Sequence, residues 1–355
     1  MRFVMHRRIR NQLPLTIWQF LDGRPGHENQ VKGLTEAISR NHDVDVFDVR
    51  VRSDLSGLKS LLPGRLDFGY SLPSPDVLIG AGHSTHLPML ASKKRFGGHT
   101  IVIMKPSLPL ALFDLCLIPA HDRLLFPARN VIRTEGALNR VRPSTRQNHE
   151  RGMILIGGPS RHFHWSDSAI VNQVQAVACN SELRWTIATS ERTPASFLRL
   201  CEETIPHIPI VSCRDCSNDW LPEQLSQSGV VWVSCDSMSM IYEALTAGAR
   251  VGLLELKPLF AGRISANIER LARNSLATPW SRWIKGDSLT AFRRPFSESD
   301  RCSVAVLDHC LSQSWAGLRQ GLFTDFLNTN HLLDNSSARL ESLAGFTNNV
   351  HVPIH

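Results

Sequence analysis

The sequence has 355 residues, of which 42% are hydrophobic and 20% charged, and a formal net charge of +7. This length exceeds what one hydrophobic core usually supports, so two domains are expected. No apolar run is long enough to cross a bilayer, and the lysines and arginines are scattered, which argues against a membrane-spanning protein and a nucleic-acid partner. Asn11, Gln12 and Pro14 prevent an uninterrupted apolar core after the basic N-terminal segment, so we expect no cleaved secretion signal and a cytoplasmic protein, at most peripheral at the inner face of a membrane.

Short apolar segments alternate with helical patterns over the first 145 residues. Strands are expected at 15–21, 44–51, 76–80, 100–104 and 114–119, and helices at about 31–38, 55–62 and 87–94. This alternation is typical of a doubly wound parallel sheet. Loops that carry Gly, His or Asp follow three of the strands, at 22–30, 81–86 and 120–123.

A polar segment without periodicity at 140–152 is expected to link this unit to a second one. Strands are then expected at 153–156, 183–189, 208–211, 230–233 and 251–254, with helices from 166 or 167, around 197–201, and at 240–248, 263–273 and 304–318. We predict domains at 1–145 and 146–325 and a flexible tail at 326–355. The predicted fold class is α/β, with two Rossmann-like, doubly wound parallel sheets facing a central cleft.

The stretch from Val230 to Leu254 reads as a strand, a turn, a helix and a second strand. A helix N-terminus at the carboxyl edge of a parallel sheet predicts an anion site built from free backbone N–H groups. Glu243 lies seven residues after Asp236 and is expected on roughly the same side, where it would accept hydrogen bonds from sugar or ribose hydroxyls. The alternative is that Asp236 and Ser237 only cap the helix and that Glu243 is solvated.

The second half carries the candidate donor-binding residues. Neither GxGxxG nor GxxxxGK[ST] is present, and the pair Cys213 and Cys216 has no second pair at zinc spacing, so no cofactor and no metal are expected. Backbone amides, hydroxyls and arginines can neutralise a diphosphate without a metal. The candidates are Gly157, Gly158, Ser160, Arg161, Ser190, Arg192, Thr193, Asp236, Ser237, Ser239 and Glu243.

The first half carries the titratable groups. His27 and His83 each follow a glycine at an expected strand end, and an imidazole is a suitable general base near neutral pH. Asp22 and Asp122 are the candidate catalytic carboxylates beside them. Gly23, Gly26, Gly82 and His121 complete the acceptor-side loops.

Five motifs together resemble the Elm family. They are DGRPGHENQ at 22–30, PAHD at 119–122, GGPS at 157–160, TSERTP at 189–194 and DSMSMIYEA at 236–244. That family comprises mitochondrial-fission factors of plants and bacterial relatives assigned as glycosyltransferases. The resemblance covers most of 18–276 in order, and it implies a GT-B fold with a nucleotide sugar bound to the C-terminal domain.

The layout is also similar to the lipid-linked N-acetylglucosamine transferase of peptidoglycan synthesis. This resemblance matches residues 26–27 to the loop after the first strand of that enzyme and residues 157–160 to the loop that opens its second domain. It matches Glu243 to the acidic residue that contacts donor hydroxyls in GT-B enzymes. Glu191 stands where the Elm pattern has arginine, which removes one expected phosphate contact and leaves Arg192.

The sequence leaves three functions open. The leading hypothesis is a metal-independent GT-B glycosyltransferase that moves a sugar from a nucleotide sugar to an envelope glycolipid or oligosaccharide, with His27 or His83 as the base. One alternative is a non-enzymatic adaptor that recruits a dynamin-like partner to a membrane. The other is a nucleotide-sugar epimerase in which Glu243 helps to break the anomeric bond.

Overall fold

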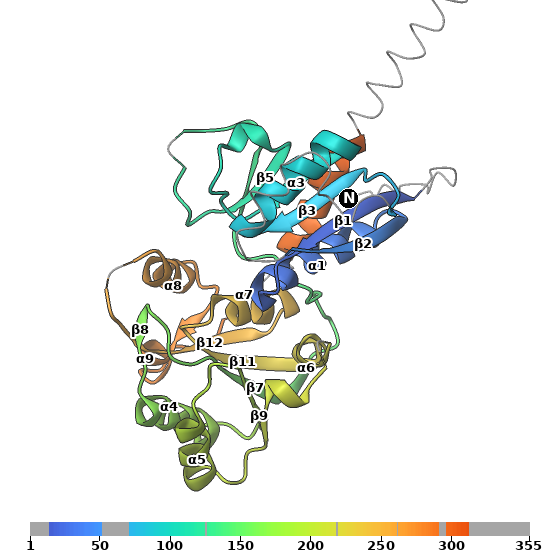
Figure 1. The fold of residues 1–355 in the computed structure, drawn as a ribbon. Coiled ribbons are helices and arrows are strands. Elements are labelled where there is room, and N and C mark those ends of the chain that lie inside the picture. The colour runs from blue at the N-terminus through green and yellow to red at the C-terminus, as the bar shows by residue number, and fades with distance from the viewer. Residues whose placement is uncertain are drawn as a thin grey trace, which may run out of the picture. The chain divides into compact units, whose positions relative to one another are not determined.

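The computed structural model describes residues 14–51, 71–124, 126–217, 219–260, 262–290 and 296–311. The helix expected at 55–62, the tail at 326–355 and the end of the helix expected at 304–318 lie outside these residues. The described chain is an α/β structure with two parallel six-stranded sheets (Figure 1). It contains no helix that is both long enough and apolar enough to span a membrane.

The first sheet has the strand order β2-β1-β3-β4-β5-β6, and all its strands are parallel. The strands are β1 (Leu15–Leu21), β2 (Val44–Arg50), β3 (Val77–Ala81), β4 (His99–Ile103), β5 (Leu115–Pro119) and β6 (Val131–Thr134). The order reverses direction at β1, with β2 on one side and β3 on the other. Because parallel crossovers are right-handed, this reversal puts α1 (Pro25–Ser39) and α3 (His83–Phe96) on opposite faces.

The central strands of the first sheet form because they are continuous apolar runs that the helices bury. All five residues of β3 and of β5 are buried, which is typical of parallel strands covered on both faces. On one face Trp18, Phe20 and Leu78 pack with Met89 of α3 in a single apolar cluster. The short helix η1 (Leu110–Leu112) leads into β5.

The second sheet has the order β10-β9-β7-β11-β12-β14 and is also parallel. Its strands are β7 (Asn148–Ile156), β9 (Arg184–Thr189), β10 (Ile210–Val211), β11 (Ser228–Ser234), β12 (Arg250–Leu254) and β14 (Thr278–Pro279). Its helices are α4 (Asp167–Cys179), α5 (Ala195–Thr204), α6 (Trp220–Gln227), α7 (Met238–Ala247), α8 (Arg263–Arg273) and α9 (Trp280–Trp283), with η2 at Cys213–Asp215. Here the order reverses between β7 and β11.

Both faces of the second sheet are covered. Residues of α6, α7 and α8 share one apolar cluster with Val231 and Val233 of β11. Residues of α4 and α5 share the other cluster with Trp232, the residue between those two valines. Alternate residues of β11 therefore face opposite helix layers, as the pleat of a strand requires. A small antiparallel ladder of β8 (Phe163–His164) and β13 (Lys257–Pro258) stands apart from the main sheet pairing.

Residues 298–300, at the start of the last described helix, contact the first half of the chain. Arg40 of α1 donates to Asp300, and Ser299 exchanges two hydrogen bonds with the backbone of Asn139. Glu298 accepts a bond from the amide of Glu135. These polar contacts attach residues 298–300 to α1 and to the segment that follows β6.

Most expected elements are confirmed, but several boundaries were wrong. Helix α3 begins at His83, inside the expected loop, and the last described helix begins at 298, before the expected 304. The first helix begins at Pro25, not near Val31, because proline at the first helical position needs no N–H partner and already has a helical φ. Strand β7 begins at Asn148, inside the expected linker, because pairing with β9 and β11 extends the strand beyond its apolar part. The elements β6, β8, α6, β13, β14 and α9 were not expected.

Candidate functional site

The candidate residues gather at the two points where strand order reverses. In the first sheet, the carboxyl ends of β1 and β3 lead to Asp22 and to Gly82. In the second sheet, the carboxyl ends of β7 and β11 lead to Gly157 and to Asp236. Ligands of open α/β sheets bind outside the carboxyl edge at such reversals. Topology therefore assigns both groups of residues to places suited to a ligand.

Asp22 and His27 form the core of the first group. His27 Nδ1 lies 2.8 Å from Asp22 Oδ2, and the Asp22 side chain is 1% exposed against 18% for His27. Ser84 Oγ donates to the same carboxylate oxygen at 3.0 Å, and the Arg24 amide donates to Oδ1 at 3.1 Å. Asp22 thus accepts from three donors, while the His27 side chain keeps part of its surface exposed.

The charge of Asp22 determines the tautomer of His27. Burial alone would raise the pKa of Asp22, but hydrogen bonds from His27, the Arg24 amide and Ser84, together with the charge of His27, outweigh it and lower the pKa. An ionised carboxylate only accepts hydrogen bonds, so Nδ1 of His27 carries a proton and donates it. In the neutral ring, Nε2 is then the proton acceptor, as a general base requires.

Gly82 is the residue whose missing side chain makes room for this pair. Its φ is +86°, a backbone conformation that glycine adopts without strain. A Cβ at this position would lie 2.5 Å from His27 Nδ1 and 3.2 Å from Asp22 Oδ2. Both the turn and the close approach of the imidazole therefore require glycine.

The other expected acceptor-side residues lie in the segments that follow β3 and β5. His83 is exposed at the start of α3, and no orienting carboxylate is recorded for it within the described chain. His86 is buried next to Ser107 Oγ at 3.2 Å; burial and the nearby His83 lower its pKa to about 4. Asp122 is buried in the turn after β5, where His121 is half-buried.

Two glycines of the first loop have local roles. The amide of Gly23, with φ +80°, donates to Glu28 Oε1 at 3.1 Å. Gly26 lies in the first turn of α1, and its carbonyl accepts from Gln30. Both shape the start of the helix that presents His27.

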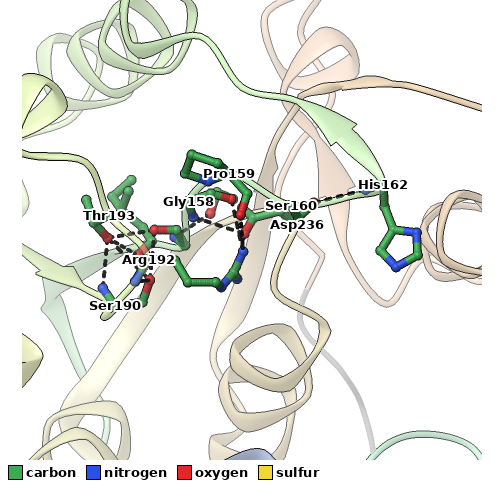
Figure 2. Close-up of polar contacts among 11 residues, drawn as sticks. Gly158, Pro159, Ser160, His162, Ser190, Arg192, Thr193 and Asp236 are labelled. Atoms are coloured by element: carbon green, nitrogen blue, oxygen red, sulfur yellow. Dashed lines mark hydrogen bonds and ion pairs between the residues drawn. The ribbon is translucent and has the colours of Figure 1, made fainter.

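Asp236 and Arg192 form the core of the second group (Figure 2). Arg192 Nη2 donates to Asp236 Oδ2 at 2.8 Å, and the same oxygen accepts from the Gly158 amide at 3.0 Å. The Asp236 side chain is completely buried, whereas that of Arg192 is 43% exposed. Arg192 Nη1 also donates to the carbonyls of Gly158 and Pro159, at 3.0 and 3.1 Å. The arginine thus joins three segments that are distant in sequence.

The glycines at 157–158 are required by the same contacts. A Cβ on Gly157 would lie 2.1 Å from Asp236 Oδ2, and one on Gly158 would lie 2.1 Å from the Arg192 carbonyl. Ser234 Oγ accepts from the Gly157 amide at 2.8 Å, and Ser190 Oγ donates to the Gly157 carbonyl at 2.8 Å. Thr193 Oγ1 lies 2.6 Å from that carbonyl as well. This loop is fully bonded to its neighbours.

Two donors and one acceptor in this group have no recorded partner. The contacts of Arg192 occupy three of the five N–H groups of a guanidinium, so one on Nη2 and the one on Nε are available to a ligand. Asp236 Oδ1 is buried and has no hydrogen-bond partner among the described residues. Asp236 therefore orients the arginine by one oxygen and keeps the other unsatisfied.

Neither Asp236 nor Ser237 caps α7 with its side chain. Glu243 is buried, not solvated, and it is not joined to Asp236: its Oε1 accepts from Asn29 Nδ2 of α1 at 2.6 Å. Burial raises the pKa of Glu243, partly offset by hydrogen bonds from Asn29 and Ser239. The carboxylates at 236 and 243 thus belong to separate networks.

The remaining donor-side candidates lie around this core. Ser160 Oγ accepts from the His162 amide at 3.3 Å, and exposed Arg161 donates through Nε to His162 Nε2 at 3.2 Å. Ser237 is buried at the start of α7. Sequence reasoning missed three contributors: Ser84, Ser234 and Asn29. Ser84 and Asn29 lie inside the loops at 81–86 and 22–30, and Ser234 ends β11 two residues before Asp236, so strand order would have identified Ser84 and Ser234.

The described chain offers a cavity elsewhere in the second sheet, apart from the two groups of candidate residues, and no metal-binding cluster. A cavity of about 740 Å³ lies near the amino ends of β7 and β9 and includes no residue of either group. No cluster of three or more His, Cys, Asp or Glu residues suited to a metal occurs in the described parts of the chain. The carboxyl-edge groups remain the chemically distinctive features.

Comparisons with known proteins agree with this architecture. An uncharacterised protein of Rickettsia prowazekii, RP120, is 22% identical over 296 residues, which cover 66% of this chain and 81% of that protein. A crystal structure of an assigned UDP-N-acetylglucosamine 2-epimerase from Listeria monocytogenes superposes with a TM-score of 0.56. The sequence identity is 12%, and the superposition covers 84% of this chain and 97% of that chain. The UDP-GlcNAc 2-epimerase of Methanocaldococcus jannaschii gives 0.51 at 12% identity, covering 84% and 100%.

These structural likenesses establish the fold, which is GT-B-like with two Rossmann-like domains, as expected from the sequence. The family model described as mitochondrial fission ELM1 matches residues 25–310, most of the chain. The matched range contains His27 and the whole second group. The chain belongs to the mitochondrial fission ELM1 family.

Proposed function

We propose that this protein is a metal-independent glycosyltransferase that moves a sugar from a nucleotide sugar to a hydroxyl of an envelope glycolipid or oligosaccharide. The observation that carries the proposal is the Asp22–His27 pair at the first strand-order reversal. It combines a buried anion with an imidazole whose outer nitrogen accepts protons. Such a pair is the usual arrangement for activating a hydroxyl.

In the proposed step, His27 Nε2 takes the proton of the acceptor hydroxyl while that oxygen attacks the anomeric carbon. The bond from the anomeric carbon to the diphosphate oxygen breaks, and the nucleoside diphosphate leaves with the electron pair. Asp22 stays ionised and stabilises the imidazolium that forms, as a carboxylate does beside a catalytic histidine. His83 has no such partner recorded, which favours His27 as the base.

On the donor side, we assign the departing diphosphate to Arg192. Its two available N–H groups form a fork suited to phosphate oxygens, and Asp236 fixes its orientation before a ligand arrives. The amides at the start of α7 add a positive helix end. The names of the two epimerase structures point to a uridine diphosphate sugar, and we extend that donor class to this chain.

An epimerase is the second candidate, because Glu243 is a buried carboxyl group with a raised pKa. A buried carboxyl group with a shifted pKa is a candidate for accepting or donating a proton. The two candidates differ in their need for an acceptor. An epimerase changes the nucleotide sugar by itself, whereas a transferase needs a second substrate.

Thermal denaturation of the full chain with UDP and other nucleoside diphosphates tests the donor site. A ligand that binds the native state raises the melting temperature. We expect UDP to stabilise the wild type and Arg184→Ala but not Arg192→Ala. Arg184 is a matched control because it is an exposed arginine paired with Glu150 at the opposite edge of the same sheet.

Mass spectrometry of the nucleotide sugar then separates the functions. Release of UDP that requires an acceptor and is lost in His27→Ala supports the transferase, and sugar altered without an acceptor supports the epimerase. If no nucleoside diphosphate binds at millimolar concentration, the proposal is wrong. Full rescue of a deletion strain by both His27→Ala and Glu243→Ala would instead favour an adaptor.

A further inference from the structure

The β8–β13 ladder presents an apolar tip at the surface. Lys257 pairs with His164 and Pro258 with Phe163, and the Leu259 amide donates to the His162 carbonyl at 3.0 Å. Beyond this last bond the chain turns, and Leu259 and Phe260 are each 54% exposed. Single exposed apolar residues are common, but two large ones in sequence at the end of a ladder form a small projecting patch.

The patch is held in place by its own ladder. Phe163 of β8 is buried in the core beneath α4 and α5. The Phe260 ring makes an edge contact with the His162 ring, with 5.9 Å between the centroids. The ladder therefore holds the two apolar side chains outward and does not fold them against the sheet.

The exposed charged residues beside the patch are cations. Arg161 and Lys257 are both exposed, and His162 and His164 lie on the same ladder. The nearest carboxylates along the chain are Asp167, which accepts from the Trp165 indole, and Glu255, which accepts from the Ser281 amide. An apolar tip with exposed cations on the same ladder is complementary to an anionic surface with an apolar interior.

We propose that the tip formed by Leu259 and Phe260 docks on an anionic lipid bilayer. The two side chains enter the acyl boundary, and Lys257 and Arg161 contact the headgroups. A protein partner is disfavoured because two apolar side chains provide far less area than a stable protein interface requires. A bilayer needs only a small apolar insertion when cations add to it, and such binding is weak and reversible.

One of the cations beside the proposed docking tip is close in sequence to the second candidate group. Arg161 directly follows the loop at 157–160, so docking would bring the second candidate group to a lipid surface. The inference goes beyond the proposed function and does not depend on it, because vesicle binding is measured without any sugar. Loss of vesicle binding and loss of nucleotide binding are separate results.

Flotation of the full chain with vesicles tests the proposal. The vesicles contain phosphatidylcholine alone or phosphatidylcholine with phosphatidylglycerol at a ratio of about three to one. We expect binding only to the anionic vesicles, with weaker binding at high salt. The double variant Leu259→Ser/Phe260→Ser should lose binding, and Lys257→Gln should weaken it about fivefold, as expected for one cation near such a surface.

Phe126→Ser is the matched control, since Phe126 is 79% exposed in the first half of the chain, outside the ladder. It should bind like the wild type. Melting curves of all variants establish that they are folded. The proposal is overturned if the wild type binds no vesicles, if the double variant binds unchanged, or if Phe126→Ser alone abolishes binding.

Discussion

The two candidate groups share one design but differ in what the carboxylate holds. In each, a buried aspartate after a central strand bonds a more exposed basic side chain: Asp22 holds His27, and Asp236 holds Arg192. Each pair is packed against a glycine that has no room for a Cβ. His27 can gain and lose a proton, whereas the guanidinium is permanently charged. The same geometry thus provides a proton acceptor in one sheet and a fixed cation in the other.

The carboxylates also differ in how completely they are bonded. Both oxygens of Asp22 accept hydrogen bonds, and its pKa is lowered. Asp236 has one oxygen with two donors and one with none. A carboxylate whose two oxygens both accept hydrogen bonds holds its partner rigidly, while one with an unbonded oxygen can accept from a further donor. We therefore expect the first pair to be more sensitive to substitution.

The largest effect is expected for Asp22→Asn. An asparagine amide can donate to Nδ1 of His27, which favours the tautomer whose Nε2 carries the proton and is no base. We expect kcat of the proposed transfer to fall about 10²- to 10⁴-fold with little change in KM. Nitrogen NMR of His27 checks the tautomer directly and does not depend on the substrate.

Ser84→Ala is the control for this change, because it removes one bond to Asp22 without altering the charge of the pair. It should reduce kcat much less. If Asp22→Asn leaves the tautomer of His27 unchanged, the carboxylate does not determine the function of the imidazole. The contrast between a proton acceptor held by Asp22 and a fixed cation held by Asp236 would then be wrong.

Gly82→Ala should have the next largest effect, and Gly97→Ala is its control. Both glycines flank α3 with φ near +85°, so alanine strains the backbone at either site by about 1–3 kcal/mol. Only at Gly82 does the new Cβ meet His27, whereas nothing lies within 4 Å at Gly97. Both variants should lose similar stability, but only Gly82→Ala should also lose about 100-fold in activity through displacement of the imidazole. Equal activity losses would show that backbone strain alone is responsible.

The sequence could predict the fold class and most strands, because parallel strands buried on both faces are continuous apolar runs. It could also place glycines and polar residues at the strand ends. It could not predict strand order, which depends on packing between distant segments. Once β7 is known to pair with β11, Gly158 and Asp236 lie at one edge, although 78 residues separate them. The pairing of Asp236 with Arg192 follows from that topology and from no local motif.

Helix periodicity was misleading for the carboxylates. A spacing of seven residues places Asp236 and Glu243 on one side only if both are helical, and α7 begins at Met238. Asp236 lies in the turn before α7 and accepts a hydrogen bond from the Gly158 amide, whereas Glu243 lies on the helix and accepts one from Asn29. The burial of Glu243 was missed because a helical pattern suggests one solvated side. In α7 every residue from Ile241 to Ala247 is buried, so no such side exists there.

A double-mutant cycle of Asp236→Asn and Arg192→Ala measures the second pair. Because one partner is exposed, we expect a coupling free energy of unfolding of about 1 kcal/mol, from urea denaturation. In Asp236→Asn the arginine keeps its charge but loses its orientation, so affinity for UDP should fall about fivefold. Tighter binding in this variant would mean that Asp236 competes with the ligand for Arg192. The analogy with Asp22 would then fail.

The smallest effect is a difference in pH dependence between Asp22 and Glu243. Because the pKa of Asp22 is lowered in the native state, its contribution to stability is present above the unfolded value of 3.8 and is lost as pH falls through the native pKa. Glu243 has the opposite sign: its pKa is raised above 4.5, so the native state binds its proton more tightly, and stability is lost as pH rises above that value. Glu243→Gln should therefore be more stable than the wild type at pH 7 and equal to it below about pH 4. Urea denaturation across this pH range measures the sign of the stability difference. If Glu243→Gln is less stable than the wild type at pH 7, the partners of Glu243 stabilise its charged carboxylate despite its burial.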